Sequence, residues 1–71
     1  MNIQLLEKKI AEKGLKKKYL ATLLNIDKST LSYKINGKRN FMVREIKKIS
    51  EILSLTDEEK LLIFFRDKVD L

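Results

Sequence analysis

Apolar residues recur at helical spacing along almost the whole chain, and this pattern predicts five helices. In the first of them, Ile3, Leu6 and Ile10 stand at positions i, i+3 and i+7. The predicted spans are about residues 2–13, from Lys16 or Lys17 to Leu24, Lys28–Asn36, 41–53, and from Thr56 through Phe65. Because no stretch alternates with period two for long enough to form a strand, we expect an all-α fold of five short helices around one core.

Residues with distinct backbone preferences fall between these helices and support their boundaries. Gly14 and Gly37 suit the left-handed residue that ends a helix. Asn25, which tolerates the same conformation, is the predicted tight turn between the second and third helices. Asp27 is the predicted N-cap of the third helix. The later helices are expected to begin at Asn40 and at the capping box formed by Thr56 and Glu59.

Composition narrows the class of protein. The chain has 71 residues, enough for one domain over residues 1–71, with the last residues, 67–71, expected to fray. It contains no cysteine and no histidine, which argues against disulfides, zinc fingers and the usual nucleophile pairs, and we expect no cofactor or metal. No apolar run approaches the ~20 residues of a membrane span. The N-terminus does not resemble a signal peptide, so the expected compartment is the cytoplasm.

Charge is distributed unevenly along the chain. Residues 1–40 carry ten basic and three acidic side chains, a net charge of +7, whereas residues 41–71 carry six basic and seven acidic ones, a net charge of −1. Such asymmetry favours a polyanionic partner for the first half. A lysine-rich solvated surface would explain the same counts.

Residues 17–36 have the layout of a DNA-binding helix-turn-helix. A small residue, Ala21, stands where two steeply crossing helices would touch, and the turn residue Asn25 follows four positions later. The apolar positions of this segment would then face one core: Leu20, Leu24, Ile26, Leu31 and Ile35.

At these residues the chain resembles helix-turn-helix proteins of the phage repressor and Cro type, also called XRE. The resemblance covers roughly residues 3–65 and is strongest over Leu31–Lys38, which is similar to a pattern of small Gram-positive phage regulators. Its other signals are Leu20-Ala21, Asn25-Ile26 and Ser29-Thr30. The chain departs from the family pattern at Asn25, where glycine is usual, at Lys17, where glutamine is common, and at Met42, where a hydroxyl residue often caps the fourth helix.

The resemblance implies a repressor-like domain whose third helix lies in the major groove of an operator. Leu31 and Ile35 point inward, so the outward positions that would contact bases are Lys28, Ser29, Ser32 and Tyr33. Lysine can donate to guanine, serine can donate or accept, and a tyrosine ring can contact a thymine methyl group. Asp27 could accept from cytosine, but capping explains it better, because a carboxylate near phosphates is unfavourable.

Phosphate contacts would come from the start of the second helix, from the loop after the third and from the fourth helix. The candidates are Lys17, Lys18, Asn36, Lys38, Arg39 and Arg44. Such contacts fix the register of a protein on DNA without reading its sequence. The remaining lysines are expected to be solvated: Lys8, Lys9, Lys13, Lys47 and Lys48. Tyr19 could shield the second helix or donate its hydroxyl to a phosphate.

The run Leu61–Phe65 contains five consecutive large apolar residues, more than one helix face can bury. One interpretation is that Leu62, Phe65 and Leu61 complete the core. The other, which the resemblance favours, places Ile63 and Phe64 at a homodimer contact.

These features predict a sequence-specific, double-stranded DNA-binding transcriptional regulator, associated with the nucleoid, that takes no small-molecule ligand. An antitoxin-like or excision-control protein on the same fold is the main alternative. RNA binding is less favoured, because clustered aromatic residues that stack on bases are missing. An enzyme using Asp57, Glu58 or Glu59 is disfavoured, since capping explains these acids. A membrane-surface peptide would need one long amphipathic helix.

Overall fold

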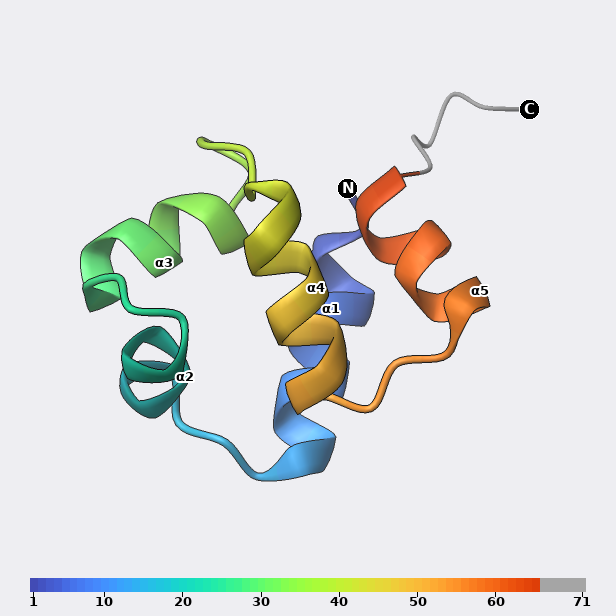
Figure 1. Cartoon of the computed structure of the whole chain (residues 1–71), viewed down its shortest axis with the longest axis horizontal. Helices are drawn as coiled ribbons and strands as arrows, with labels where there is room; N and C mark the ends of the chain where they lie inside the picture. The colour runs from blue at the N-terminus through green and yellow to red at the C-terminus, as the bar shows by residue number, and fades with distance from the viewer. Residues whose placement is uncertain (66–71) are drawn as a thin grey trace.

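The computed structural model describes residues 1–65, and all regular structure in this range is helical. The elements are α1 (Ile3–Lys13), α2 (Lys17–Leu23), α3 (Lys28–Ile35), α4 (Val43–Ile52), α5 (Asp57–Lys60) and a π-helical turn, η1 (Leu61–Phe65). Figure 1 shows α1 and α4 in the middle of the molecule, the pair α2 and α3 at one end, and α5 with η1 at the other. The all-α prediction is confirmed, whereas the predicted fraying of residues 67–71 lies outside the described residues.

Most of the predicted helix ends are present. The Asp27 carboxylate accepts a hydrogen bond from the Thr30 backbone N–H at 2.7 Å. Asn25 has a φ of 59°, so the asparagine turn replaces the usual glycine without a change of backbone conformation. Thr56 and Glu59 form the predicted capping box, with bonds of 2.9 and 3.1 Å. Within residues 1–65, no helix is long and apolar enough to cross a membrane.

The start of α4 differs from the prediction. The helix begins at Val43 after the N-cap residue Met42, not at Asn40, so the predicted cap is wrong. The cap is supplied from inside the helix, because the Glu45 carboxylate accepts from the Met42 backbone N–H at 2.8 Å. A methionine can therefore occupy the N-cap position, since Glu45 satisfies its backbone donor.

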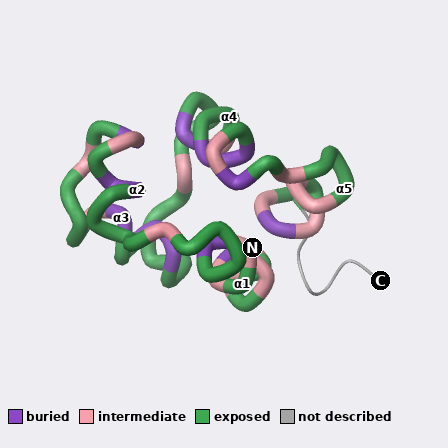
Figure 2. The backbone as a smooth tube through the Cα atoms, turned by 90° about the horizontal axis from the view of Figure 1, so that it is seen from below, coloured by how far each residue is buried: buried purple, intermediate pink, exposed green. Residues whose placement is uncertain are grey.

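The core lies where α1, α2, α3, α4 and η1 meet, and in the tube view its buried positions lie on the sides of the helices that face one another (Figure 2). Its most completely buried side chains are Leu6, Leu20, Leu31, Ile35, Ile49 and Ile63. Burial of aliphatic side chains such as these stabilises a domain by about 1.5–3 kcal/mol each. This core holds the α2–α3 pair against the rest of the molecule.

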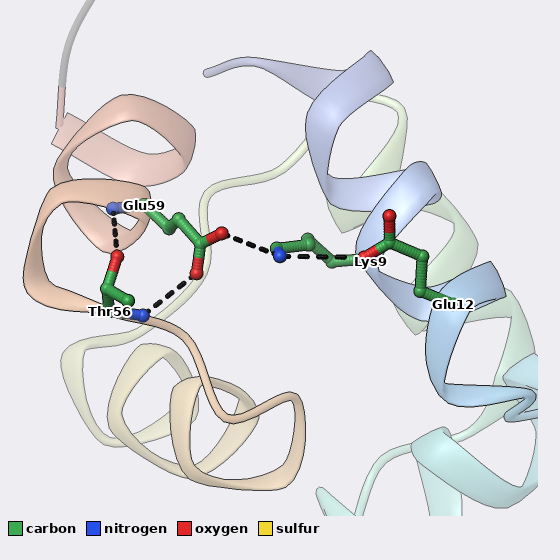
Figure 3. A network of polar contacts seen from close by, with 4 residues as sticks. All are labelled: Lys9, Glu12, Thr56 and Glu59. Atoms are coloured by element: carbon green, nitrogen blue, oxygen red, sulfur yellow. Dashed lines mark hydrogen bonds and ion pairs between the residues drawn. The ribbon is translucent and has the colours of Figure 1, made fainter.

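Polar contacts tie α5 and η1 to the N-terminal helix. The Asn2 backbone N–H donates to the Ile63 carbonyl oxygen at 2.9 Å. Lys9 in α1 pairs with Glu59 in α5 at 2.6 Å and reaches Glu12 at 3.5 Å (Figure 3). The hydrogen bond with Glu59 raises the pKa of Lys9, and the hydrogen bonds from Lys9 and the Thr56 backbone lower the pKa of Glu59. Lys9, predicted to lie on a solvated face, is half-buried and paired with Glu59, a partner that the sequence did not predict.

The side chains of Leu61–Phe65 are buried and exposed in a pattern that differs from both predictions. Ile63 is completely buried, so its assignment to a dimer contact is wrong. Phe64 is half-buried and packs edge-to-face on Phe41, with ring centroids 5.5 Å apart. Leu61 and Phe65 are the exposed members of the run, and they do not complete the core. The i→i+5 bonding of the π turn changes which side chains face inward, and α-helical spacing could not predict this change.

Candidate nucleic-acid interface

The turn between α2 and α3 is held to α2 by two backbone hydrogen bonds. The Asn25 backbone N–H donates to the Thr22 carbonyl oxygen, and that of Ile26 donates to the Ala21 carbonyl oxygen, both at 3.0 Å. Ala21 is buried, and its small side chain lets α2 and α3 approach closely. The turn and the core together fix the orientation of α3 at the end of the molecule (Figure 1).

All four residues predicted to contact bases lie on the exposed side of α3. Lys28, Ser29, Ser32 and Tyr33 are exposed. Ser29, Ser32 and Tyr33 follow Lys28 by one, four and five positions, so the four residues share a helix face. Leu31 and Ile35 are buried on the opposite side. The structure therefore brings the predicted reading residues together on one outward surface, which we call the α3 face.

Asp27 is fixed by its capping role at the start of this helix. The hydrogen bonds from the Thr30 side chain and backbone lower the pKa of the Asp27 carboxyl, and the nearby charge of Arg39 lowers it further. The group therefore stays ionised at neutral pH. The Asp27 carboxylate accepts its hydrogen bond from Thr30, within the same protein.

The residues predicted to contact phosphates are all exposed: Lys17, Lys18, Asn36, Lys38, Arg39 and Arg44. Lys17 differs from the others because its ammonium group pairs with the Glu7 carboxylate in α1 at 2.9 Å. The N-cap residue of α2, Lys16, makes no side-chain hydrogen bond to the helix, so the first backbone N–H groups of α2 have no side-chain cap.

Two contacts join the loop after α3 to the reading residues. The Arg39 guanidinium lies 5.5 Å from the centroid of the Tyr33 ring. The Asn36 amide donates to the Ser32 hydroxyl at 3.4 Å. Each contact links a predicted phosphate-contacting residue to a predicted base-contacting one, which the sequence pattern did not indicate.

A buried ion pair behind the α3 face was not predicted from the sequence. Lys34 Nζ lies 2.5 Å from Glu45 Oε1, and the two side chains are only 9% and 5% exposed. Burial alone would raise the pKa of Glu45. The hydrogen bonds from Lys34 and from the Met42 backbone, with the charges of Lys34 and Arg44, outweigh this effect and leave the pKa below its usual value. The pair connects α3 to the start of α4.

An exposed polar helix, set by a tight turn against a second helix and flanked by cations, defines the helix-turn-helix class of DNA-binding domain. The family model described as Helix-turn-helix (HTH_3) matches residues 6–60. The chain therefore belongs to the helix-turn-helix family of Cro/XRE type, whose members are DNA-binding regulators. Neither the curated proteins nor the solved structures gave a match.

Proposed function

We propose that this protein is a sequence-specific, double-stranded DNA-binding transcriptional regulator that places α3 in the major groove of its operator. The observation that carries the proposal is the α3 face, which presents Lys28, Ser29, Ser32 and Tyr33 together. Exposed cations also stand at the start of α2 and in the loop that directly follows α3. Base edges would be read by the α3 face, and these cations would neutralise phosphates.

Two alanine substitutions separate reading from phosphate binding. Lys28→Ala removes a proposed base contact and is expected to cost about 1–3 kcal/mol on the operator while relaxing the preference at one base pair. Lys38→Ala removes a proposed phosphate contact and should weaken binding to operator and random duplexes alike. Equal losses on both duplexes for both variants would refute the assignment of α3 as the reading helix.

The salt dependence of binding tests the phosphate contacts as a group. If a dimer neutralises about eight phosphates, the logarithm of the association constant should fall with a slope of roughly −7 against the logarithm of salt concentration. Binding should change little between pH 6 and 8, since the chain contains no histidine, the side chain that ordinarily changes charge in that range. A slope near zero would refute the phosphate assignment.

The proposed functional unit on DNA is a homodimer on an inverted repeat. Leu61 and Phe65 are 49% and 57% exposed and four residues apart, so they offer an apolar surface on one side of the last turn. The helix α3 and the turn η1 lie toward opposite ends of the molecule (Figure 1). A two-fold axis beside Phe65 would leave both α3 helices free to enter half-sites about one helical turn, ~34 Å, apart.

Sedimentation on an operator duplex tests the dimer. Phe65→Asp should convert a two-to-one complex into a one-to-one complex with weaker binding. Ala11→Asp, which adds the same charge at an exposed position of α1, is the matched control and should keep the two-to-one complex. A one-to-one complex of the unmodified protein, with protection of a single half-site, would refute the dimer.

A further inference from the structure

The loop after α3 folds back over the last turns of that helix. Gly37 has a φ of 80°, a left-handed conformation that reverses the chain direction at the end of α3. The backbone N–H groups of Lys38 and Arg39 then donate to the Tyr33 carbonyl oxygen at 2.8 and 3.3 Å. Arg39 is therefore attached through its backbone to the residue that its side chain covers.

Arg39 is exposed, and its guanidinium lies over the ring of Tyr33. Its guanidinium carbon is 5.5 Å from the centroid of the Tyr33 ring, within the range of a cation–π contact. The charge of Arg39 also reaches the carboxylate of Asp27 at the other end of α3. The contact with the ring therefore holds the guanidinium near the helix.

This arrangement restricts the conformations of the Tyr33 side chain. Its side chain is 46% exposed, and an exposed ring loses conformational freedom when it must hold one orientation against a base. A guanidinium stacked on one face of the ring restricts it before DNA arrives. The ordering cost of binding is correspondingly smaller.

We propose that Arg39 is a positioning residue, which holds the Tyr33 ring in the orientation that reads the operator, and is not a phosphate contact of the same kind as Lys38. This inference rests on the proposed function, because it takes Tyr33 to face the bases. It changes the expected role of Arg39 from sequence-independent attraction to sequence discrimination.

The two roles respond differently to a conservative substitution. A phosphate contact needs mainly the positive charge, so Arg39→Lys would preserve it. A stacking contact needs the planar guanidinium, which an ammonium group replaces poorly. Arg39→Lys should therefore leave affinity for random duplex and the salt slope unchanged, while lowering the ratio of random to operator dissociation constants about two- to fivefold.

A double-substitution cycle shows whether Arg39 acts through Tyr33. The duplex is the one most enriched by selection from a random pool, and a scrambled duplex of equal length serves as the random probe. Tyr33→Ala should lower discrimination, and Tyr33→Ala combined with Arg39→Lys should lower it no further. The matched control, Lys38→Ala, changes the neighbouring loop cation and should weaken both duplexes equally.

The contact can also be tested without DNA. In the free protein, Arg39→Lys should shift the NMR signals of the Tyr33 ring, while those of Tyr19, exposed on α2, stay in place. Unshifted Tyr33 signals would overturn the inference, as would an Arg39→Lys protein with undiminished discrimination or a cycle in which the losses multiply. A wild-type protein that prefers no duplex would instead overturn the proposed function itself.

Discussion

Lys34 and Glu45 form an ion pair whose two side chains are both buried. The substitution Lys34→Met removes the ammonium group and keeps most of the length and apolar volume of the side chain. Glu45 then retains the hydrogen bond from the Met42 backbone but loses its opposite charge. A carboxylate that is 5% exposed would remain without its cation.

The free energy of unfolding that Lys34→Met is expected to remove is large for so small a protein. Removing one partner of a buried ion pair costs about 3–5 kcal/mol, because the remaining charge is uncompensated. At roughly 0.05–0.15 kcal/mol per residue, a protein of this length has a free energy of unfolding of about 4–10 kcal/mol. Lys34→Met should therefore remove a third or more of the total.

Urea unfolding followed by circular dichroism at neutral pH measures this loss. With a slope of about 1–1.5 kcal/mol per molar urea, the midpoint should fall by about 2 M or more. Lys38→Met, at an exposed position of the adjacent loop, is the control and should change stability by less than about 0.5 kcal/mol. The double variant Lys34→Met, Glu45→Gln should recover part of the loss, since an uncharged amide needs no charge partner and its oxygen can still accept from the Met42 backbone N–H.

Acidification gives a second measure of the same pair. Because the folded pKa of Glu45 lies below its ordinary value of 4.5, its contribution is complete above that value and is lost as the pH falls through the folded pKa. In Lys34→Met, burial instead favours the protonated carboxyl. The stability difference between the two proteins should therefore narrow from pH 7 to pH 4. A Lys34→Met protein within 0.5 kcal/mol of wild type at neutral pH would refute the reasoning.

Three further predictions concern other parts of the molecule. Glu7→Gln should release Lys17 for phosphate and strengthen binding to operator and random duplexes alike, with a steeper salt slope; unchanged binding would mean that Lys17 makes no DNA contact. Ser50→Ala should leave the free energy of unfolding in urea unchanged or raise it by up to about 1 kcal/mol, because within residues 1–65 the buried Ser50 hydroxyl has no hydrogen-bond partner. A clear loss of stability would mean that the hydroxyl does have a partner. Asn25→Ala should cost about 1–2 kcal/mol, whereas Asn25→Gly should be tolerated, since φ is 59° there; equal losses would contradict the turn assignment.

Much of the fold could be predicted because its determinants are local. Asp27 caps α3 through a bond to a residue three positions away, and Asn25 turns the chain by its own backbone preference. The periodicity of apolar residues then placed Leu31 and Ile35 inward and the four reading residues outward. Each of these predictions uses interactions within about four residues, which a sequence displays directly.

Two of the errors lie where distant segments meet. Lys34 and Glu45 fall on the buried stripes of α3 and α4, next to Ile35 and Ile49, but charged residues are ordinarily taken as exposed. The sequence did contain a sign of this ion pair, because Lys34 and Glu45 carry opposite charges at positions that the helical spacing places toward the core. Ile63 faces inward because η1 packs against the N-terminus, where Asn2 binds its carbonyl oxygen across sixty residues of chain. No local pattern predicts that contact.

The most direct test of the central claim, that the α3 face reads operator sequence, is selection from a random pool of duplex DNA followed by sequencing. The pool should be selected in parallel with the wild-type protein and with Lys28→Ala. The wild-type protein should enrich an inverted repeat with half-site centres about one helical turn apart, and the variant should enrich the same repeat with a relaxed preference at one base pair in each half-site. Enrichment of no motif by the wild-type protein, or of an identical motif by both proteins, would contradict the account.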